Sequence, residues 1–260
     1  MDPLEPLVKA LHSEGRLRVW SLVITVFGDL VQYRGGVITT GQLGEILGRV
    51  GVEPGTLRTA LSRLARDGWV ESERDGRISR YRLTPEGVAE FAPATSRIYA
   101  APQREPVKRW AVTVRLGPNG SPEIRLLPSE AKDDGSDLRI DGTLSGMSPA
   151  YRAALLPDDR RAALGALARD LANLQVVPKD PLDAAAARML LIHRWRRIVL
   201  RWPDIAPELM PDDAPLTDPR ADVAAAYRRL SPKAERWLGL DWGSETAHRA
   251  AMGRFGGLDL

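Results

Sequence analysis

The chain has 260 residues, of which 43% are hydrophobic and 27% charged, with 37 Lys and Arg against 34 Asp and Glu. This composition is typical of a folded globular protein, and the length favours two or three small domains. The absence of cysteine excludes disulfides, cysteine-ligated zinc and thiol catalysis. No apolar run reaches membrane-spanning length and the first residues do not resemble a secretory signal, so we expect a cytoplasmic protein with no membrane partner.

The N-terminal third begins with a pattern of short helices. Residues 1–15 read as a polar lead-in. From Leu17 to Val31, apolar residues recur at helical spacing and predict a first helix with a wide buried face. Residues 37–38 are expected to form a short strand. Thr39 and Gln42 have the spacing of a capping box, which predicts that a second helix begins there.

A third helix and a hairpin follow. Leu57, Leu61 and Leu64 recur at i, i+4 and i+7 and therefore share one buried face of a helix. The opposite face presents hydrogen-bond donors, namely Thr56, Thr59, Ser62, Arg63 and Arg66. Asp75-Gly76 suits the turn of a hairpin, whose strands carry Arg74, Arg77, Arg80 and Arg82. This layout is that of a winged helix-turn-helix, which places a helix in the major groove and a hairpin on the phosphate backbone.

The donors in this segment divide by expected role. Thr59, Ser62 and Arg63 are the best candidates for base edges, because arginine can pair with guanine through two hydrogen bonds. Arg58, Arg77 and Arg80 are better suited to phosphates, which position a protein on DNA without reading its sequence. Thr56 and Arg66 complete the expected DNA-binding set. By the helix pattern alone, a solvated face without function is about as well supported as DNA binding.

The remainder of the chain alternates between turns and regular segments. Residues 92–106 contain three prolines and predict a linker. Three strands are expected at 110–116, 123–127 and 137–144, within a small β-rich section. Three helices are expected at 158–174, 182–202 and 219–238, and the glycine-rich tail from Gly239 is expected to be loosely held.

A second cationic cluster lies in the longest of these helices. It comprises His193, Arg194, Arg196, Arg197 and Arg201, interleaved with Trp195 and Trp202. A solvated or interdomain face around a packed tryptophan is slightly favoured. The alternatives are a site for an anionic effector, formed by His193, Arg196 and Arg197, and docking of the helix against the winged section of the same or a partner subunit. The three histidines of the chain have no metal-ligand spacing.

No motif of catalysis is found in the sequence. A phosphate-binding loop, a dinucleotide fingerprint and a nucleophile elbow are all missing. We therefore expect a protein that is not an enzyme, with no catalytic residue, metal or cofactor.

Several segments together resemble the PaaX-type transcriptional regulators, which repress phenylacetate catabolism. The resemblance lies in SLVITVFGD, RGG, LRTALSRLARDGWV and R-x-S-x-YRLT near the N-terminus, and in LLIHRWRRIVLRWPDIAPELMP and AYRRLSPKAERWL near the C-terminus. It implies a dimeric repressor of a catabolic operon that binds a palindromic double-stranded DNA operator and is released by an acyl-coenzyme A thioester. Between residues 109 and 150 the arginine-rich helix and the Gly-Phe-Gly-like turn of a ferredoxin-like middle domain are missing, so the resemblance fails there.

Together these observations predict a mostly helical α+β protein in five parts. They are a lead-in (1–15), a winged helix DNA-binding domain (16–91), a linker (92–106), a small β-rich middle domain (107–150) and a helical C-terminal effector and dimerisation domain (151–260). Two alternatives stay open. One is a winged-helix regulator controlled by a protein partner instead of a small molecule, and the other, less favoured, is an enzyme that carries a winged-helix module.

Overall fold

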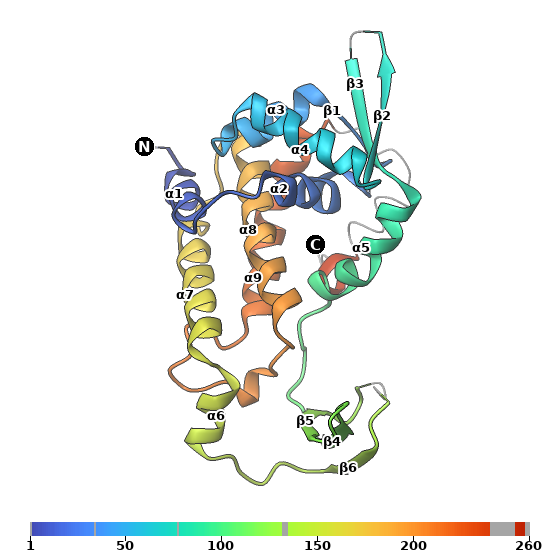
Figure 1. Cartoon of the computed structure of the whole chain (residues 1–260). Coiled ribbons are helices and arrows are strands. Elements are labelled where there is room, and N and C mark those ends of the chain that lie inside the picture. Colours follow the sequence, from blue (N-terminus) through green and yellow to red (C-terminus); the bar gives the residue numbers. More distant parts are fainter. Residues whose placement is uncertain (1, 34, 77, 132–134, 240–252, 258–260) are drawn as a thin grey trace. The chain divides into compact units, whose positions relative to one another are not determined.

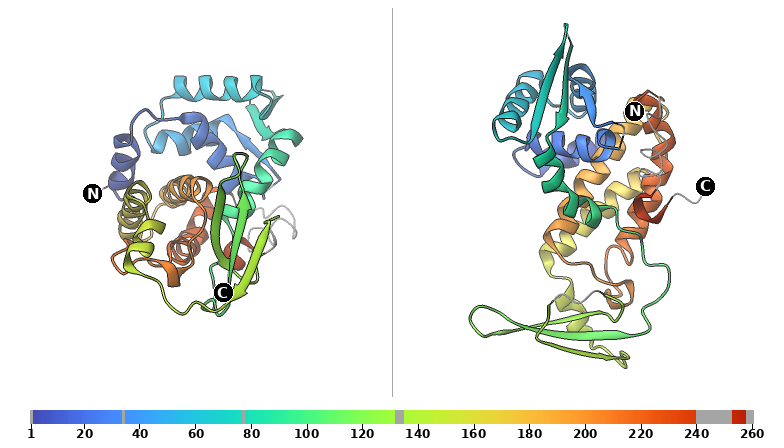
Figure 2. Two further views of the ribbon diagram at one scale, coloured as in Figure 1. Left: turned by 60° about the horizontal axis from the view of Figure 1, so that its bottom comes forward. Right: turned by 90° about the vertical axis from the view of Figure 1, so that its right-hand side faces the viewer.

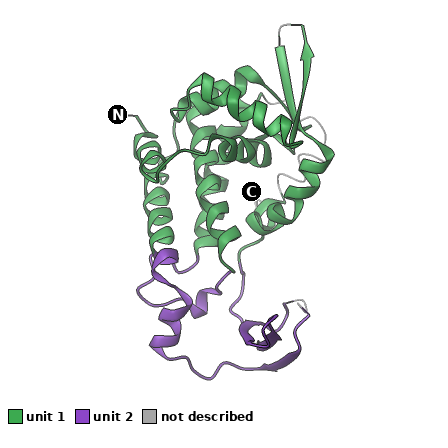
Figure 3. Ribbon diagram, in the orientation of Figure 1, with its two compact units in different colours: residues 1–102, 162–203, 219–260 green, residues 103–161, 204–218 purple. Residues whose placement is uncertain are grey.

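A computed structural model describes residues 2–33, 35–76, 78–131, 135–239 and 253–257 of the chain (Figure 1). The chain divides into two compact units, shown in Figure 3. Unit 1 comprises residues 1–102, 162–203 and 219–260, and unit 2 comprises residues 103–161 and 204–218. Helices predominate and both sheets are small and antiparallel, so the expected α+β class with mostly helical content is confirmed.

The N-terminal part of unit 1 is a group of short helices. They are α1 (Glu5–Ser13), α2 (Val19–Val26), the π-helix η1 (Phe27–Val31), α3 (Thr40–Arg49) and α4 (Pro54–Arg66). The helix expected from Leu17 to Val31 is confirmed as α2 continued by η1, and Leu22, Phe27 and Leu30 are fully buried. The lead-in is also helical, and its apolar residues Leu4, Leu7 and Leu11 are buried in the core of the unit.

The beginning of α3 confirms the expected capping box. The backbone N–H of Gln42 donates to Thr39 Oγ1 at 3.2 Å, and the backbone N–H of Thr39 donates to Gln42 Oε1 at 3.0 Å. Two N–H groups that the first turn of a helix leaves without partners are thereby satisfied. Pro54 occupies the first turn of α4, where its missing N–H is not needed.

A three-stranded sheet accompanies these helices. It consists of β1 (Val37–Thr39), β2 (Val70–Asp75) and β3 (Ile78–Leu83), in the antiparallel order β1-β3-β2. Val37 pairs with Arg82, so the expected short strand is present and joins the hairpin. Gly76 has φ +60°, which the tight turn between β2 and β3 requires. Figure 1 shows the hairpin extending away from the helices, and every residue of β2 after Val70 is exposed.

The rest of unit 1 is built from long helices. α5 (Pro85–Ile98) follows the hairpin, and α7 (Asp158–Asn173), α8 (Pro181–Arg201), α9 (Pro219–Trp237) and the 3₁₀ turn η3 (Arg254–Gly256) follow later in the chain. α8 packs along α9 and also contacts α2, α3 and α5 (Figure 2). No helix in the described part of the chain has both the length and the apolar character needed to cross a membrane.

One expectation about irregular segments is wrong, and a second is contradicted at residues 254 and 255. Residues 92–98, assigned to a linker, are the second half of α5, because Pro93 lies in an otherwise continuous helix. The tail was expected to be loosely held, but Arg254 and Phe255 are only 8% and 2% exposed. The Phe255 ring packs against Tyr99 and Tyr227, with centroid distances of 5.4 and 5.3 Å. Most other residues of the tail, 240–252 and 258–260, lie outside the described residues.

Unit 2 contains a second sheet. Its strands are β4 (Trp110–Leu116), β5 (Pro122–Pro128) and β6 (Leu138–Gly142), in the antiparallel order β5-β4-β6, which confirms the three expected strands. The helix α6 (Pro149–Leu155) and the 3₁₀ turn η2 (Pro207–Leu209) complete the described part of the unit.

The two faces of the second sheet differ in polarity. On one face the residues aligned across the strands are all apolar, namely Leu126, Val112 and Ile140 in one row and Ile124, Val114 and Leu138 in the next. Ile124, Leu138 and Ile140 are each at least half exposed. On the other face, the Arg139 guanidinium donates to the backbone oxygen of Ser129 at 2.5 Å, so the segment after β5 folds over that side.

Candidate nucleic-acid interface

The outer face of α4 is exposed along its whole length. Leu57, Ala60, Leu61 and Leu64 anchor the helix in the core, and the expected DNA-binding residues Thr56, Arg58, Thr59, Ser62, Arg63 and Arg66 are all exposed. At 100° per residue, Thr59, Ser62 and Arg66 point most directly away from this core. Arg58 lies on one flank of the exposed face, and Thr56 and Arg63 lie on the other.

The donors of α4 are weakly engaged within the chain. Thr59 Oγ1 donates to the backbone oxygen of Gly55 at 3.1 Å. Arg63 and Arg66 each place their Nε atom 3.5 Å from a carboxylate oxygen of Asp67, and all three side chains are at least 40% exposed. Arg58 has no partner among the residues that the structure describes. Exposed ion pairs of this kind contribute about 0–1 kcal/mol, so a phosphate or a base can replace them.

The hairpin arginines pair with acids of the same hairpin. Arg80 Nη1 lies 2.9 Å from Asp75 Oδ2, and Arg82 Nε lies 2.7 Å from Glu71 Oε1. Asp75 and Glu71 therefore neutralise part of the positive charge of the hairpin. Arg77, which was expected to contact phosphate, lies outside the described residues.

A groove lies beside α4 within unit 1. It has a volume of about 960 Å³ and is lined by the Thr56, Thr59 and Arg63 side of α4, by residues 14–21, and by His193 and Arg197 of α8. Arg16 and Arg18 are exposed on the segment before α2 and form no hydrogen bond or ion pair with another described residue. These two arginines were not predicted as site residues, because no periodicity marks a residue in a loop.

The cationic cluster of α8 faces the N-terminal helices. The Arg196 guanidinium donates to the backbone oxygen of Ser21 and to Thr25 Oγ1, both at 3.1 Å. His193 Nδ1 lies 3.0 Å from the same Thr25 oxygen. α8 thus docks against α2 in the N-terminal part of the same chain, which agrees with the docking alternative for this cluster.

Charge and burial set the state of the cluster. Burial, followed by the charges of Arg196, Arg197 and Arg194, lowers the pKa of His193 from 6.5 to about 3, so the imidazole is neutral at pH 7. Arg197 Nη1 lies 2.5 Å from Glu14 Oε2. Arg194 contacts Glu14 and Asp170. Of the three residues expected to bind an effector, Arg196 is therefore engaged with α2, whereas His193 and Arg197 line the groove.

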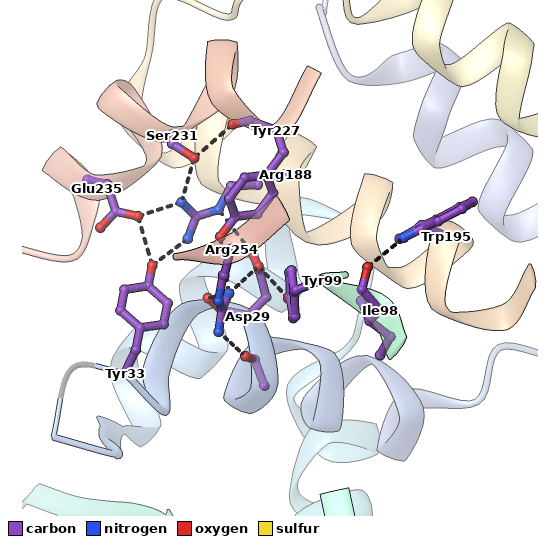
Figure 4. A network of polar contacts seen from close by, with 11 residues as sticks. Asp29, Tyr33, Ile98, Tyr99, Arg188, Trp195, Tyr227, Ser231, Glu235 and Arg254 are labelled. Atoms are coloured by element: carbon purple, nitrogen blue, oxygen red, sulfur yellow. Dashed lines mark hydrogen bonds and ion pairs between the residues drawn. The ribbon is translucent and has the colours of Figure 1, made fainter. Parts of the chain in front are cut away.

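A buried ionic network joins α8 and α9 to the N-terminal helices (Figure 4). The fully buried Arg188 donates to Asp29 Oδ2 at 3.1 Å, to Glu235 Oε1 at 2.5 Å and to the Tyr33 hydroxyl oxygen at 2.8 Å. Arg254 donates to Asp29 Oδ1 at 3.0 Å. Burial alone would lower the pKa of Arg188. The negative charge of Asp29 is the largest effect in the opposite direction, and the pKa of Arg188 is raised above its ordinary value.

This network was not predicted from the sequence, although two signals were present. Asp29 interrupts the apolar pattern of the first helix, and Arg188 follows four alanines in the middle of the long helix. A charged residue inside an apolar run needs a buried partner, because an unpaired charge cannot be buried without a large loss of stability. The partners themselves lie more than 150 residues apart in the case of Asp29 and Arg188, and local spacing cannot identify them.

These features define a mostly helical α+β protein with an exposed helix, an arginine-bearing hairpin and a long C-terminal helix, α8, that packs against α2, α3 and α5. Comparison with known families gives two matches. The model described as "PaaX-like protein" matches residues 18–87, and the one described as "PaaX-like protein C-terminal domain" matches residues 160–239. The chain belongs to the PaaX-like family, as its sequence motifs suggested.

A curated relative aligns with almost the whole chain. It is described as "Transcriptional repressor PaaX" of Escherichia coli (strain K12) and is 27% identical over 286 aligned positions, which cover 92% of this chain and 90% of the relative. The relative is named as a transcriptional repressor, which agrees with the expectation of a non-enzymatic protein.

Proposed function

We propose that the protein is a sequence-specific DNA-binding transcriptional repressor in which residues 16–91 form a winged helix domain and α4 reads the major groove. The exposed donor-bearing face of α4 beside the arginine-bearing hairpin carries this proposal. The E. coli relative, named as a transcriptional repressor, supports it. The middle section (107–150) and the helical part (151–260) would serve regulation and assembly.

Within this interface the flanks of α4 have different tasks. Thr59, Ser62 and Arg63 contact base edges, with Arg63 in the bidentate arrangement that selects guanine. Arg58 and Arg80 contact phosphates, a role also proposed for Arg77, which lies outside the described residues. The contacts of Arg63 with Asp67 and of Arg80 with Asp75 are exposed ion pairs, which a base edge or a phosphate can replace at little loss.

Selection of bound sequences from genomic DNA by the purified protein tests the proposal, followed by binding measurements with two variants. Arg63→Ala should weaken binding by about 1–3 kcal/mol and relax the preference at one base position. Arg58→Ala should weaken binding to all sequences alike and reduce the salt dependence by about one counterion. Arg229→Ala, on the exposed side of α9, serves as the control. Failure to select any sequence would refute the proposal, and exchanged effects of Arg63 and Arg58 would refute the assigned roles.

A homodimer on a palindromic operator is the assembly that we propose. Two-fold symmetry in a protein matches two half-sites in DNA. The apolar face of the sheet in unit 2 offers a surface for the second copy. Its aligned rows contain no charged residue, so two identical faces can meet without repulsion between like charges. The helical part from residue 151 was the region first expected to dimerise.

Light scattering of the purified protein and of two variants tests this surface. Ile140→Glu places a charge in the centre of the apolar face and should convert a dimer into a monomer. Glu123→Gln, on the opposite face of the same sheet, should leave the mass unchanged. If Ile140→Glu is still a dimer, the dimer interface would be assigned to the helical part (151–260) instead. A monomeric parent protein would refute the proposed dimer.

An anionic effector of the acyl-coenzyme A type is the proposed signal that releases the repressor from DNA. The family resemblance suggests this class, and the arginines near α8 suit its phosphates. The rival is control by a protein partner, bound through the middle section. Ligand-induced thermal shifts would support the effector, whereas specific capture of a protein by the parent and not by a variant lacking the middle section would support the rival.

A further inference from the structure

The groove beside α4 brings together residues with two different expected roles. Thr56, Thr59 and Arg63 belong to the face of α4 that we assign to DNA, and His193 and Arg197 belong to the α8 cluster that we assign to an effector. They come from positions more than 100 residues apart in the sequence. Both groups line a single cavity of about 960 Å³, at the upper end of the range of about 300–1,000 Å³ that small-molecule sites occupy.

The lining of the groove suits an organic anion with an apolar part. Arg16, Arg18, Arg63 and Arg197 contribute four cationic side chains, and Glu14 is the acidic one among the lining residues. Leu11, Leu17, Val19 and Trp20 add apolar surface. Because Glu14 pairs with Arg197, Arg16 and Arg18 remain available for a ligand.

His193 provides the groove with a fixed hydrogen-bond acceptor. The Thr25 hydroxyl donates to the backbone oxygen of Ser21 at 2.9 Å, so its oxygen accepts the hydrogen of His193 Nδ1 at 3.0 Å. In the neutral imidazole, Nε2 then carries a lone pair. His193 is only 7% exposed, and Nε2 has no partner among the described residues. A ligand in the groove would satisfy this atom with an N–H or O–H donor.

We infer that the groove is the effector site and that the effector competes directly with DNA for the Thr56 and Arg63 flank of α4. This inference rests on the proposed function and adds a location and a mode of release to it. The ligand is an organic anion with an apolar part and a hydrogen-bond donor. Its negative charge on Arg63 and its bulk beside Thr59 exclude a DNA strand from the same surface.

Direct competition differs measurably from release by a changed spacing of the two winged domains. A competitor raises the apparent Kd of DNA in proportion to its concentration, without a plateau, and acts equally on a duplex that contains a single half-site. An allosteric effector reaches a plateau, typically at about 5–150-fold. A change of spacing leaves single half-site binding unaffected.

The experiment measures fluorescence anisotropy of a labelled half-site duplex bound to the full-length protein. The probes are a panel of coenzyme A thioesters with different acyl groups, coenzyme A alone and the corresponding free acids. We expect at least one thioester to raise the apparent Kd of the duplex. Above the Kd of the thioester for the protein, each tenfold increase in its concentration should raise the apparent Kd of the duplex tenfold. A plateau, an effect confined to the full palindrome, or a panel without any effect would overturn the inference. DNA binding without ligand, which the proposed function requires, is measured in the same titration.

Two variants of His193 locate the ligand. In His193→Asn the side-chain amide reaches the position of Nδ1 and retains the contact with Thr25, but Nε2 is lost. In His193→Gln the amide reaches the position of Nε2. Loss of one hydrogen bond should raise the inhibition constant of the thioester about three- to tenfold in His193→Asn. The affinity of this variant for the half-site duplex, measured without thioester, should stay within twofold of the parent. His193→Gln should recover part of the loss. Equal inhibition constants in the parent and both variants would place the ligand elsewhere.

Discussion

Arg188→Met tests the buried ionic network. Methionine keeps most of the length of the side chain but removes its charge and its donors. Arg188 is fully buried and donates to Asp29, Glu235 and Tyr33. Removal of one member of a buried ion pair typically destabilises a protein by about 3–5 kcal/mol, because the charge that stays behind loses its compensation. At this chain length the melting temperature should fall by about 6–20 °C.

Urea unfolding followed by circular dichroism measures this change. Arg229→Met, on an exposed position of α9, is the matched control and should alter the free energy of unfolding by no more than about 0.5 kcal/mol. The double variant Arg188→Met/Glu235→Gln should be less destabilised than the sum of the single variants, since the second change removes a carboxylate that has lost its cation. The expected loss of unfolding free energy is about 3–5 kcal/mol. A loss of less than about 1 kcal/mol in Arg188→Met would therefore refute this account of the network.

Three further predictions concern single positions. Because burial and three arginines lower the pKa of His193 to about 3, the unfolded chain takes up a proton below pH 6.5 that the folded chain does not. Stability should therefore fall as the pH drops from about 6.5 towards 3, by up to about 1.4 kcal/mol per pH unit, and His193→Asn should show a flatter profile in urea unfolding at several pH values. Thr39→Ala removes the cap of α3 and should lower the free energy of unfolding by about 0.5–2 kcal/mol in the same assay; an unchanged value would mean that the cap is dispensable. A Cβ at Gly87 would lie 2.6 Å from the backbone oxygen of Trp69, so Gly87→Ala should lower the melting temperature, whereas Gly44→Ala, where the added atom meets no neighbour within 4 Å, should not.

Much of the secondary structure follows from local signals. The capping pair Thr39 and Gln42, the leucines of α4 and the Asp75-Gly76 turn each specify their element within a few residues, and the structure agrees. The errors occurred where tertiary contacts decide. Pro93 was interpreted as the mark of a linker, yet α5 continues through it. Arg97 and Ile98, at the end of α5, hydrogen-bond to α8, with Ile98 accepting from Trp195 Nε1 at 2.9 Å.

The candidate site was predictable to a different degree. The exposed donors of α4 could be selected because a helix with one apolar stripe must expose the opposite side. The groove could not, because its lining joins residues of α4 and α8 that are far apart in the sequence, and it depends on how α8 docks onto α2. Arg196 illustrates the limit of spacing arguments. It was grouped with His193 and Arg197 on the basis of sequence proximity, but it donates to Ser21 and Thr25, leaving the other two to line the groove.

The network around Asp29 has a consequence for synthesis on the ribosome. Asp29 is synthesised well before its partners, because Arg188 follows it by 159 residues and Arg254 by 225. Burial of the carboxylate without these cations would cost much stability, so the nascent N-terminal helices cannot reach their final packing until both arginines have left the ribosome. A prematurely terminated product would therefore lack a stable helix-and-hairpin surface and would not compete with complete molecules for their binding sites.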